Sequence, residues 1–348
     1  MKKSSILLIP IFYIVSIACS FASEISIIGV GDIMPGTNYP STAYLPRNDG
    51  SNLFDSARNI LKDADVTFGN LEGALLNKGK SAKTCSDPSK CYIFRIPEHY
   101  VNHLKKAGFD VLSIANNHVG DFGNLGRKKT VSTLKKAGIY FAGQTTCPSA
   151  LFEINKVKYG FCAFAPNRGT MDVRNIDKLG KIVRKLNSVS DIVIVSFHGG
   201  AEGAAHRYVT RKTEMFYGEN RGNVYKFAHR AIDAGADIVL GHGPHVARAV
   251  ELYKNRFIAY SLGNFCTYGR FSLRGPNGIA PIIKVHLDHS GKFKTGRIYS
   301  FKQEKGKGPE PDPANRAVKE IRKLTAHDFP KTNLIIQDNG RILRKDRK

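Results

Sequence analysis

The sequence has 348 residues, of which 42% are hydrophobic and 24% are charged, a composition typical of a folded chain and not of a disordered one. Its 33 glycines and 15 prolines follow no repeat, which excludes collagen-like and low-complexity proteins. Lys and Arg outnumber Asp and Glu by 53 to 29, so the net charge is +24. Such a surplus favours polyanionic partners or anionic surfaces. A basic surface that meets only solvent is the alternative.

Residues 1–22 have the pattern of a secretory signal peptide. Two lysines precede an apolar run at residues 6–18, and the small residues Ser20 and Ala22 suit cleavage after position 22. The run is shorter than the roughly 20 residues that a spanning helix needs. We therefore expect an exported protein, periplasmic or extracellular, with no transmembrane span in the mature chain. Lipidation at Cys19 is the weaker alternative, because the usual leucine of a lipoprotein box is absent.

The cysteines are interpreted in the light of that export. Cys85 and Cys91 flank the turn-forming residues 86–90, and in an oxidising compartment this spacing predicts a disulfide. A thiolate metal site is less favoured, because no second close pair completes a four-cysteine set. Cys162 and Cys266 lie in apolar, strand-like segments and are expected to be core residues.

Six apolar, partly β-branched runs end abruptly in polar residues and are expected to be strands. They cover residues 25–30, 65–68, 111–115, 192–197, 238–240 and 257–260. Three helix-period segments lie between such runs and end in Gly108, Gly138 and Gly235, the residue type that stops a helix after its last turn. Strands that alternate with helices predict an α/β fold with a substantial parallel sheet.

Hairpin patterns add antiparallel strands at residues 151–164 and 281–301. From residue 302 the chain becomes rich in Pro, Gly and charge, as linkers are. A short helix near 315–324 and a small hairpin around 338–340 are expected beyond it. These patterns predict one domain over residues 24–302 and a charged C-terminal extension with its linker over 303–348.

Polar side chains follow the expected strands. Ligands bind outside the carboxyl ends of the strands in α/β sheets, so neighbouring strands would bring these side chains together. A single histidine or asparagine at such a place is usually a hydrogen-bonded turn residue, but six coincidences favour one shared site. The residues are Asp32, Asn70, Glu72, Asn116, Asn117, His118, His198, His242, His245 and Asn264.

This mixture of oxygen and nitrogen donors, without a thiolate, suits one or two divalent metal ions. Zn, Mn or Fe is favoured over Mg because the set contains imidazoles. A metal bound there could polarise a phosphoryl or carbonyl oxygen and lower the pKa of bound water. The sequence contains no P-loop, no G-x-S-x-G elbow and no zinc knuckle that would indicate another chemistry.

Several sequence strings occur in an order that points to a known family. They are VGDIM at 30–34, GNLEG at 69–73, FRIP at 94–97, ANNH at 115–118 with DFG at 121–123, His198 with Glu202, GHGPHV at 241–246 and YSLGNF at 260–265. Together they resemble the CapA family of poly-γ-glutamate capsule biosynthesis proteins, which is similar in fold to calcineurin-like metallophosphoesterases. The resemblance covers roughly residues 25–287. It implies a bacterial envelope protein built as a sandwich of two mixed β-sheets flanked by helices.

The resemblance also implies roles for single residues. Asp32 matches the first metal aspartate, and Asn70 or Glu72 stands where phosphoesterases carry a bridging Asp. Asn117 and His118 match an Asn-His motif, in which the Asn is a ligand and the His contacts the leaving group. The late histidine ligands are matched by His198 and His242, with His245 beside them.

This sequence departs from the family pattern at four places. The D-x-H string ends in Met34, and the second motif lacks its Asp. The H-W-G-x-E-Y string has Gly199 in place of Trp and Gly203 in place of Tyr, and Gly243 replaces a histidine of G-H-H-P-H. The number of metal ions and the native substrate therefore stay open.

Two functions follow as hypotheses. The first is a metal-dependent hydrolase or transferase that acts on an anionic envelope polymer or a phosphoester. In it His118 is the acid or base, paired with Asp121, and Arg95, Glu202 and Asn264 bind substrate. A purely structural His118–Asp121 pair and a structural salt bridge at Arg95 are the alternatives.

The second is a non-catalytic component of capsule assembly or export that binds polyglutamate. In both hypotheses the expected partner is an acidic polymer such as poly-γ-glutamate, with other capsule-synthesis proteins as further candidates. Nucleic acid is not expected.

Overall fold

The computed structural model describes residues 24–84 and 91–345. The predicted signal peptide and Cys19 lie outside these residues, as does Cys85, so the expected Cys85–Cys91 disulfide stays a prediction. Within the described residues, Cys162 and Cys266 are buried, as expected, and are free thiols. No helix in the described part of the chain is both long and apolar enough to cross a bilayer.

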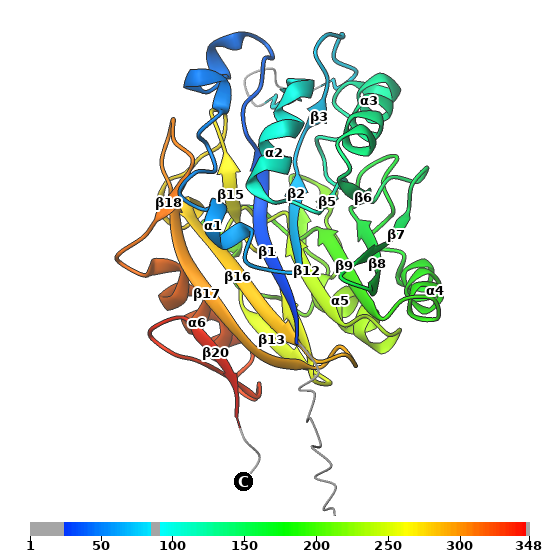
Figure 1. The fold of residues 1–348 in the computed structure, drawn as a ribbon, viewed down its shortest axis with the longest axis vertical. Coiled ribbons are helices and arrows are strands. Elements are labelled where there is room, and N and C mark those ends of the chain that lie inside the picture. The colour runs from blue at the N-terminus through cyan, green and yellow to red at the C-terminus, as the bar shows by residue number, and fades with distance from the viewer. Residues whose placement is uncertain (1–23, 85–90, 346–348) are drawn as a thin grey trace, which may run out of the picture.

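The larger of two main sheets has ten strands and is mixed (Figure 1). Its parallel half consists of β1 (Ile25–Met34), β2 (Val66–Leu71), β5 (Val111–Ser113) and β6 (Tyr140–Ala142), with β15 (Asn264–Thr267) alongside the end of β1. Its antiparallel half continues from β1 through β16 (Ile279–Leu287), β17 (Phe293–Gln303), β20 (Arg341–Arg344) and β19 (Leu334–Ile336).

The second sheet has six strands in the order β13 (Val250–Tyr253), β14 (Arg256–Ala259), β12 (Ile238–His242), β9 (Ile192–His198), β8 (Val157–Phe164) and β7 (Ser149–Ile154). The inner four strands are parallel, and both edge strands are antiparallel. The expected hairpin of β7 and β8 turns at Asn155 and Lys156, which both have a positive φ, as a two-residue type I′ turn requires.

Short strands make two smaller pairs away from the main sheets. β3 (Ala74–Leu75) runs parallel to β4 (Arg95–Ile96), and β10 (Met215–Phe216) forms a hairpin with β11 (Glu219–Asn220). The first pair follows β2 in the chain and contains Arg95.

Apolar side chains divide the molecule into layers. One core, which includes Phe68 and Leu240, lies between the two sheets. A second core covers the outer face of the larger sheet, under α1 (Arg58–Leu61), α2 (Val101–Ala107) and α3 (Gly123–Lys136). A third covers the smaller sheet under α4 (Ile176–Asn187) and α5 (Val224–Asp233). The predicted α/β sandwich of two mixed sheets flanked by helices is confirmed.

Three glycines end helices as the sequence predicts. Gly108, Gly138 and Gly235 follow α2, α3 and α5 and have φ values of 106°, 66° and 109°, the left-handed conformation that glycine adopts at low cost. Each glycine turns the chain towards the next strand. The six expected strands are also present, with ends that differ by a few residues.

Residues 303–345, which the sequence suggested as a linker and a charged extension, pack onto the same domain. β18 (Pro309–Pro311) pairs with β17, and the predicted hairpin forms as β19 and β20 at the edge of the larger sheet. α6 (Arg316–Asp328) buries Val318 and Ile321 in the core between the sheets. The apolar face of this helix is the physical reason that the segment docks.

Candidate metal centre at the strand ends

The carboxyl ends of β1, β2, β9 and β12 meet at one place between the sheets. Asp32 on β1 lies opposite Asn70 on β2, and His198 on β9 lies opposite His242 on β12. Backbones approach closely here, because a Cβ at Gly31 would stand 2.1 Å from the carbonyl oxygen of Gly263. The glycine before Asp32 thus allows β1 to pass β15 where the polar residues begin.

Glycines also bring the two histidine strands together. Gly243 has a φ of 115°, and a Cβ there would stand 2.7 Å from the backbone nitrogen and oxygen of Gly199. The Gly199 N–H donates to the carbonyl of His242 at 2.8 Å. Two of the departures from the family strings are therefore in contact, and this close approach keeps the ends of β9 and β12 in register.

Asp32, Glu72 and His198 form a completely buried group. Each offers one ligand atom, and these atoms lie within 4.8 Å of one another. Glu72 directly follows β2, where its N–H donates to the carbonyl of Ile33 on β1 at 2.9 Å. The strand ends therefore bring together carboxylate and imidazole donors that could hold a metal ion.

Neither carboxylate oxygen of Glu72 has a hydrogen-bond partner. Three imidazole nitrogens lie around Oε1, with Nε2 of His245 at 3.6 Å and Nε2 of His118 and His198 at 4.0 Å. Burial raises the pKa of Glu72 well above its usual value, and the charge of His245 opposes the shift. A buried carboxylate without donors is costly unless a cation neutralises it.

His198 and His242 are buried, and burial lowers the pKa of both rings, that of His198 most strongly. His242 Nε2 lies 3.0 Å from the carbonyl oxygen of Val30 and donates to it, which leaves Nδ1 without a hydrogen-bond partner. Metal-binding histidines usually donate their second nitrogen to such an acceptor. Nε2 of His198 also has no hydrogen-bond partner.

His245 lies against the carboxylates instead. Its Nδ1 is 2.9 Å from Oδ2 of Asp32, and its backbone has a φ of 56°. Burial acts to lower its pKa, but the charges of Glu72 and Asp32 outweigh burial and raise the pKa to about 10. Without a metal, the imidazolium of His245 thus balances part of the negative charge of the two carboxylates.

Asn70 and Asn116 lie beside this group. Asn70 donates to Oδ1 of Asp32 at 2.8 Å and lies 3.4 Å from Nδ1 of His198. Asn116, in contrast, is a clamp that donates to the carbonyl of Leu71 and to Oδ1 of Asn70. The Oδ1 atom of Asn117 is buried and has no hydrogen-bond partner.

Taken together, these donors fit a divalent transition metal. Buried polar atoms in proteins nearly always have a hydrogen-bond partner. At the strand ends, lone-pair atoms of Glu72, His198, His242 and Asn264 are buried without such a partner, and this mixture of oxygen and nitrogen donors is one that Zn, Mn or Fe accepts.

His118 and Asp121 form a buried pair beside the group. Nδ1 of His118 lies 2.8 Å from Oδ2 of Asp121, and its ring packs on Phe94 at 4.1 Å between centroids. Burial lowers the pKa of His118, and Asp121 opposes the shift. Lys83 lies 3.5 Å from Oδ1 of Asp121. The aspartate fixes the ring so that Nε2 faces Glu72.

The three expected substrate residues have different surroundings. The guanidinium of Arg95 donates to Oδ1 of Asn38 at 2.5 Å and to the carbonyl of Gly79 at 2.8 Å, so it clamps two loops. Asn264 donates to the carbonyls of His245 and Asn277. Arg95 therefore has the contacts of a structural residue.

Glu202 contacts Arg221, a residue that the sequence patterns did not indicate. Its Oε1 lies 2.9 Å from the guanidinium of Arg221, and its Oε2 lies 4.0 Å from Nε2 of His245. Arg221 is 2% exposed and contributes to the low pKa of His198. It directly follows the β10–β11 hairpin, and no strand-end pattern could have indicated it.

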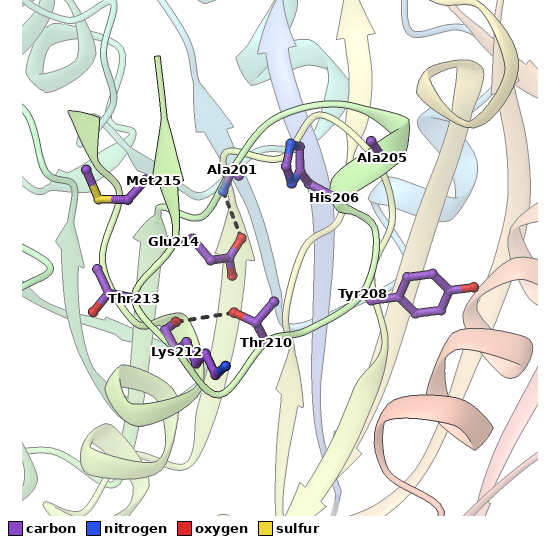
Figure 2. Close-up of a pocket in the computed structure, with 9 residues that line it drawn as sticks. All are labelled: Ala201, Ala205, His206, Tyr208, Thr210, Lys212, Thr213, Glu214 and Met215. Carbon is purple, nitrogen blue, oxygen red and sulfur yellow. Dashed lines mark hydrogen bonds between the residues drawn. The ribbon is translucent and has the colours of Figure 1, made fainter. Parts of the chain in front are cut away.

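A cavity of about 310 Å³ opens beside this network, and Figure 2 shows nine of its lining residues. Glu214 lies in its wall and accepts from the Ala201 N–H at 2.9 Å. None of the expected metal or catalytic residues lines this cavity. Lys212 and His206 give its wall basic groups.

Comparison with known proteins places the chain in a family. Residues 26–268 match the family model described as "Bacterial capsule synthesis protein PGA_cap". The chain is 29% identical to the "Capsule biosynthesis protein CapA" of Bacillus anthracis over 68% of this chain and 58% of that protein. It is 26% identical to the "PGA biosynthesis protein CapA" of Bacillus subtilis (strain 168), over 77% and 68%.

Among solved structures, a 5'-nucleotidase precursor from Thermus thermophilus matches with a TM-score of 0.46 and 12% identity, over 88% of this chain and 59% of that one. This distant match carries no conclusion about the site. The family match covers more than half of the chain and includes the elements that bear the buried group. The chain belongs to the bacterial capsule synthesis protein PGA_cap family.

Proposed function

We propose that this protein is an exported, metal-dependent hydrolase or transferase that acts on an acidic polymer of the bacterial envelope, poly-γ-glutamate. The observation that carries the proposal is the buried group of donors without hydrogen-bond partners at the strand ends. Family membership supports a role in capsule synthesis, and the name of the Bacillus subtilis relative, a PGA biosynthesis protein, supports polyglutamate as the polymer.

The side chains divide into metal ligands and a residue for proton transfer. Asp32, Glu72 and His198 would hold the metal, with His242 and Asn117 as further ligands. A metal held there would polarise a carbonyl or phosphoryl oxygen and lower the pKa of bound water. His118 faces the same centre, and Asp121 holds its ring in one orientation. His118 would therefore hold or deliver a proton to the leaving group.

The charge of the protein supports a polyanionic substrate. Its net charge is +24, and a positive surface raises the local concentration of a carboxylate polymer. Polyglutamate binding should therefore weaken steeply as salt rises to physiological strength, where screening acts beyond roughly 8 Å. Binding that does not change with salt concentration would contradict this part of the proposal.

The same charge favours a second function, in which the protein holds the polymer during capsule assembly or export without cleaving it. One experiment separates the two. The metal content of the purified protein is measured, and γ-glutamyl oligomers and a phosphodiester are then offered as substrates. Metal together with cleavage of either substrate supports the enzyme. Metal with polymer binding and no turnover supports the binding component, and a protein that binds no metal refutes the proposed centre.

A further inference from the structure

A second group of metal-type donors lies on the surface and shares no residue with the buried centre. Asp49 lies in the turn at Arg47–Gly50, His99 in a short 3-10 helix (Glu98–Tyr100) and His103 in α2. One ligand atom from each lies within 4.8 Å of the others. His99 and Asp49 are exposed, and His103 is partly exposed.

The two histidines are placed by helical geometry. They are four positions apart in a helical stretch that continues from Glu98–Tyr100 into α2, so both rings project from one face. Their ring centroids are 6.3 Å apart. Such spacing allows two imidazoles of one helix to reach the same ion.

Asp49 comes to them from a distant loop. Its Oδ2 lies 2.6 Å from Nε2 of His99, and its backbone carbonyl oxygen lies 2.8 Å from Nε2 of His103. Asn48 and Asp49 both have a positive φ, 51° and 52°, which is uncommon for residues other than glycine. The backbone thus presents both the carboxylate and the carbonyl of Asp49 to the two rings.

We propose that Asp49, His99 and His103 bind a transition-metal ion such as Zn²⁺, Ni²⁺ or Cu²⁺. Bonds of about 2.0–2.2 Å from zinc to nitrogen and oxygen ligands place neighbouring ligands of a tetrahedral ion roughly 3.3 Å apart. The His99–Asp49 contact therefore has to widen by less than about 1 Å, which exposed side chains can do. The ion replaces the proton between them, and this proton leaves to solvent.

The proposed ion would connect residues 47–50 to the helical stretch that follows β4, the strand of Arg95. β4 is joined to the strand ends through Asn38, whose N–H donates to the carbonyl of Arg95 and whose Oδ1 accepts from its guanidinium. The alternative is a simple ion pair of His99 with Asp49. An ion pair is not stabilised by Ni²⁺ or Cu²⁺. The affinity of a metal site, in contrast, should be higher for Cu²⁺ than for Ni²⁺.

The test counts bound ions in the full-length protein by equilibrium dialysis against Ni²⁺ and Zn²⁺. Glu72→Gln weakens the buried centre and leaves the surface group intact, so this variant is the background. We expect one bound ion to be lost on His103→Ala and on His99→Ala. His289→Ala, a change at an exposed hairpin histidine, should lose none.

A second readout guards against misfolding. In the Glu72→Gln background Ni²⁺ should raise the melting temperature, and the rise should disappear with His103→Ala while the melting temperature without metal stays close to that of the control. An unchanged ion count and an unchanged Ni²⁺ response in both histidine variants would overturn the surface site. Because every variant carries the same Glu72→Gln change, the buried centre contributes equally to each count, and failure of the proposed enzyme function would leave the result unaffected.

Discussion

Two buried polar clusters in this protein differ in how their charges are balanced. Arg248 is completely buried and pairs with Glu214, with N–O distances of 2.9 and 2.7 Å to its two carboxylate oxygens. The backbone of Ala201 completes the pair, since its N–H donates to Glu214 and its carbonyl accepts from Arg248. At the strand ends, by contrast, Glu72 has no donor on either oxygen.

The difference indicates which cluster has a structural role and which one could bind a ligand. The Arg248–Glu214 pair carries its own counter-charge and nearly all its hydrogen bonds, so it needs no ligand to be stable. The strand-end group has two buried carboxylates, and two of its imidazoles, His198 and His242, each have a ring nitrogen that meets no hydrogen-bond partner. A buried carboxylate without hydrogen-bond donors is costly, so Glu72 is the group that a cation bound there would stabilise, beyond the charge that His245 supplies.

The largest effect is expected for His118→Ala. If the protein is an enzyme, loss of the acid or base should reduce turnover by roughly 10²–10⁴-fold and leave metal content unchanged, because the ring pairs with Asp121. Metal content and steady-state rates on the active substrate measure it, with His289→Ala as the matched control. Equal loss of metal and rate would instead make His118 a ligand.

Arg248→Met should test the Arg248–Glu214 pair. It leaves Glu214 buried without its counter-charge, which should lower the free energy of unfolding by about 3–5 kcal/mol. Urea denaturation of the metal-free protein measures the loss. The double variant Arg248→Met, Glu214→Leu should recover much of it, and a double variant as unstable as the single one would contradict the pairing argument.

Asp237 is a buried carboxyl outside both clusters and gives a pH test. It accepts from the Val193 N–H and pairs with Arg256, but burial raises its pKa to about 6. The folded state therefore keeps this proton at pH values where the unfolded chain has released it. Stability should fall as pH rises from about 4 to about 6. Asp237→Asn should flatten that part of the curve, measured by urea denaturation at several pH values.

Loss of a single ligand side chain should have a smaller effect, which is measured as metal affinity. Asp32→Ala and His242→Ala should each lower metal affinity by roughly tenfold or more, in line with the cost of losing groups around a metal. Circular dichroism should show an intact fold. Arg95→Gln is the control, because Arg95 contacts loops and not the buried group. Unchanged affinity in Asp32→Ala would place the ion elsewhere.

The sequence by itself determined the secondary structure and the inventory of the site. Apolar runs with polar ends indicated the strands, and Gly108, Gly138 and Gly235 indicated where helices stop, because such signals act over a few neighbouring residues. The strand-end pattern also selected Asp32, Glu72 and His198, which the structure brings within ligand distance.

Only the tertiary structure decided how these residues are used. His245 and Asp32 are 213 positions apart, and their hydrogen bond exists because the two sheets pack face to face. The same packing gives His242 the carbonyl of Val30 as acceptor, whereas loop contacts occupy Arg95 and bring Arg221 to Glu202. Local periodicity encodes the elements, but partners distant in sequence are chosen by the packing of whole sheets and loops.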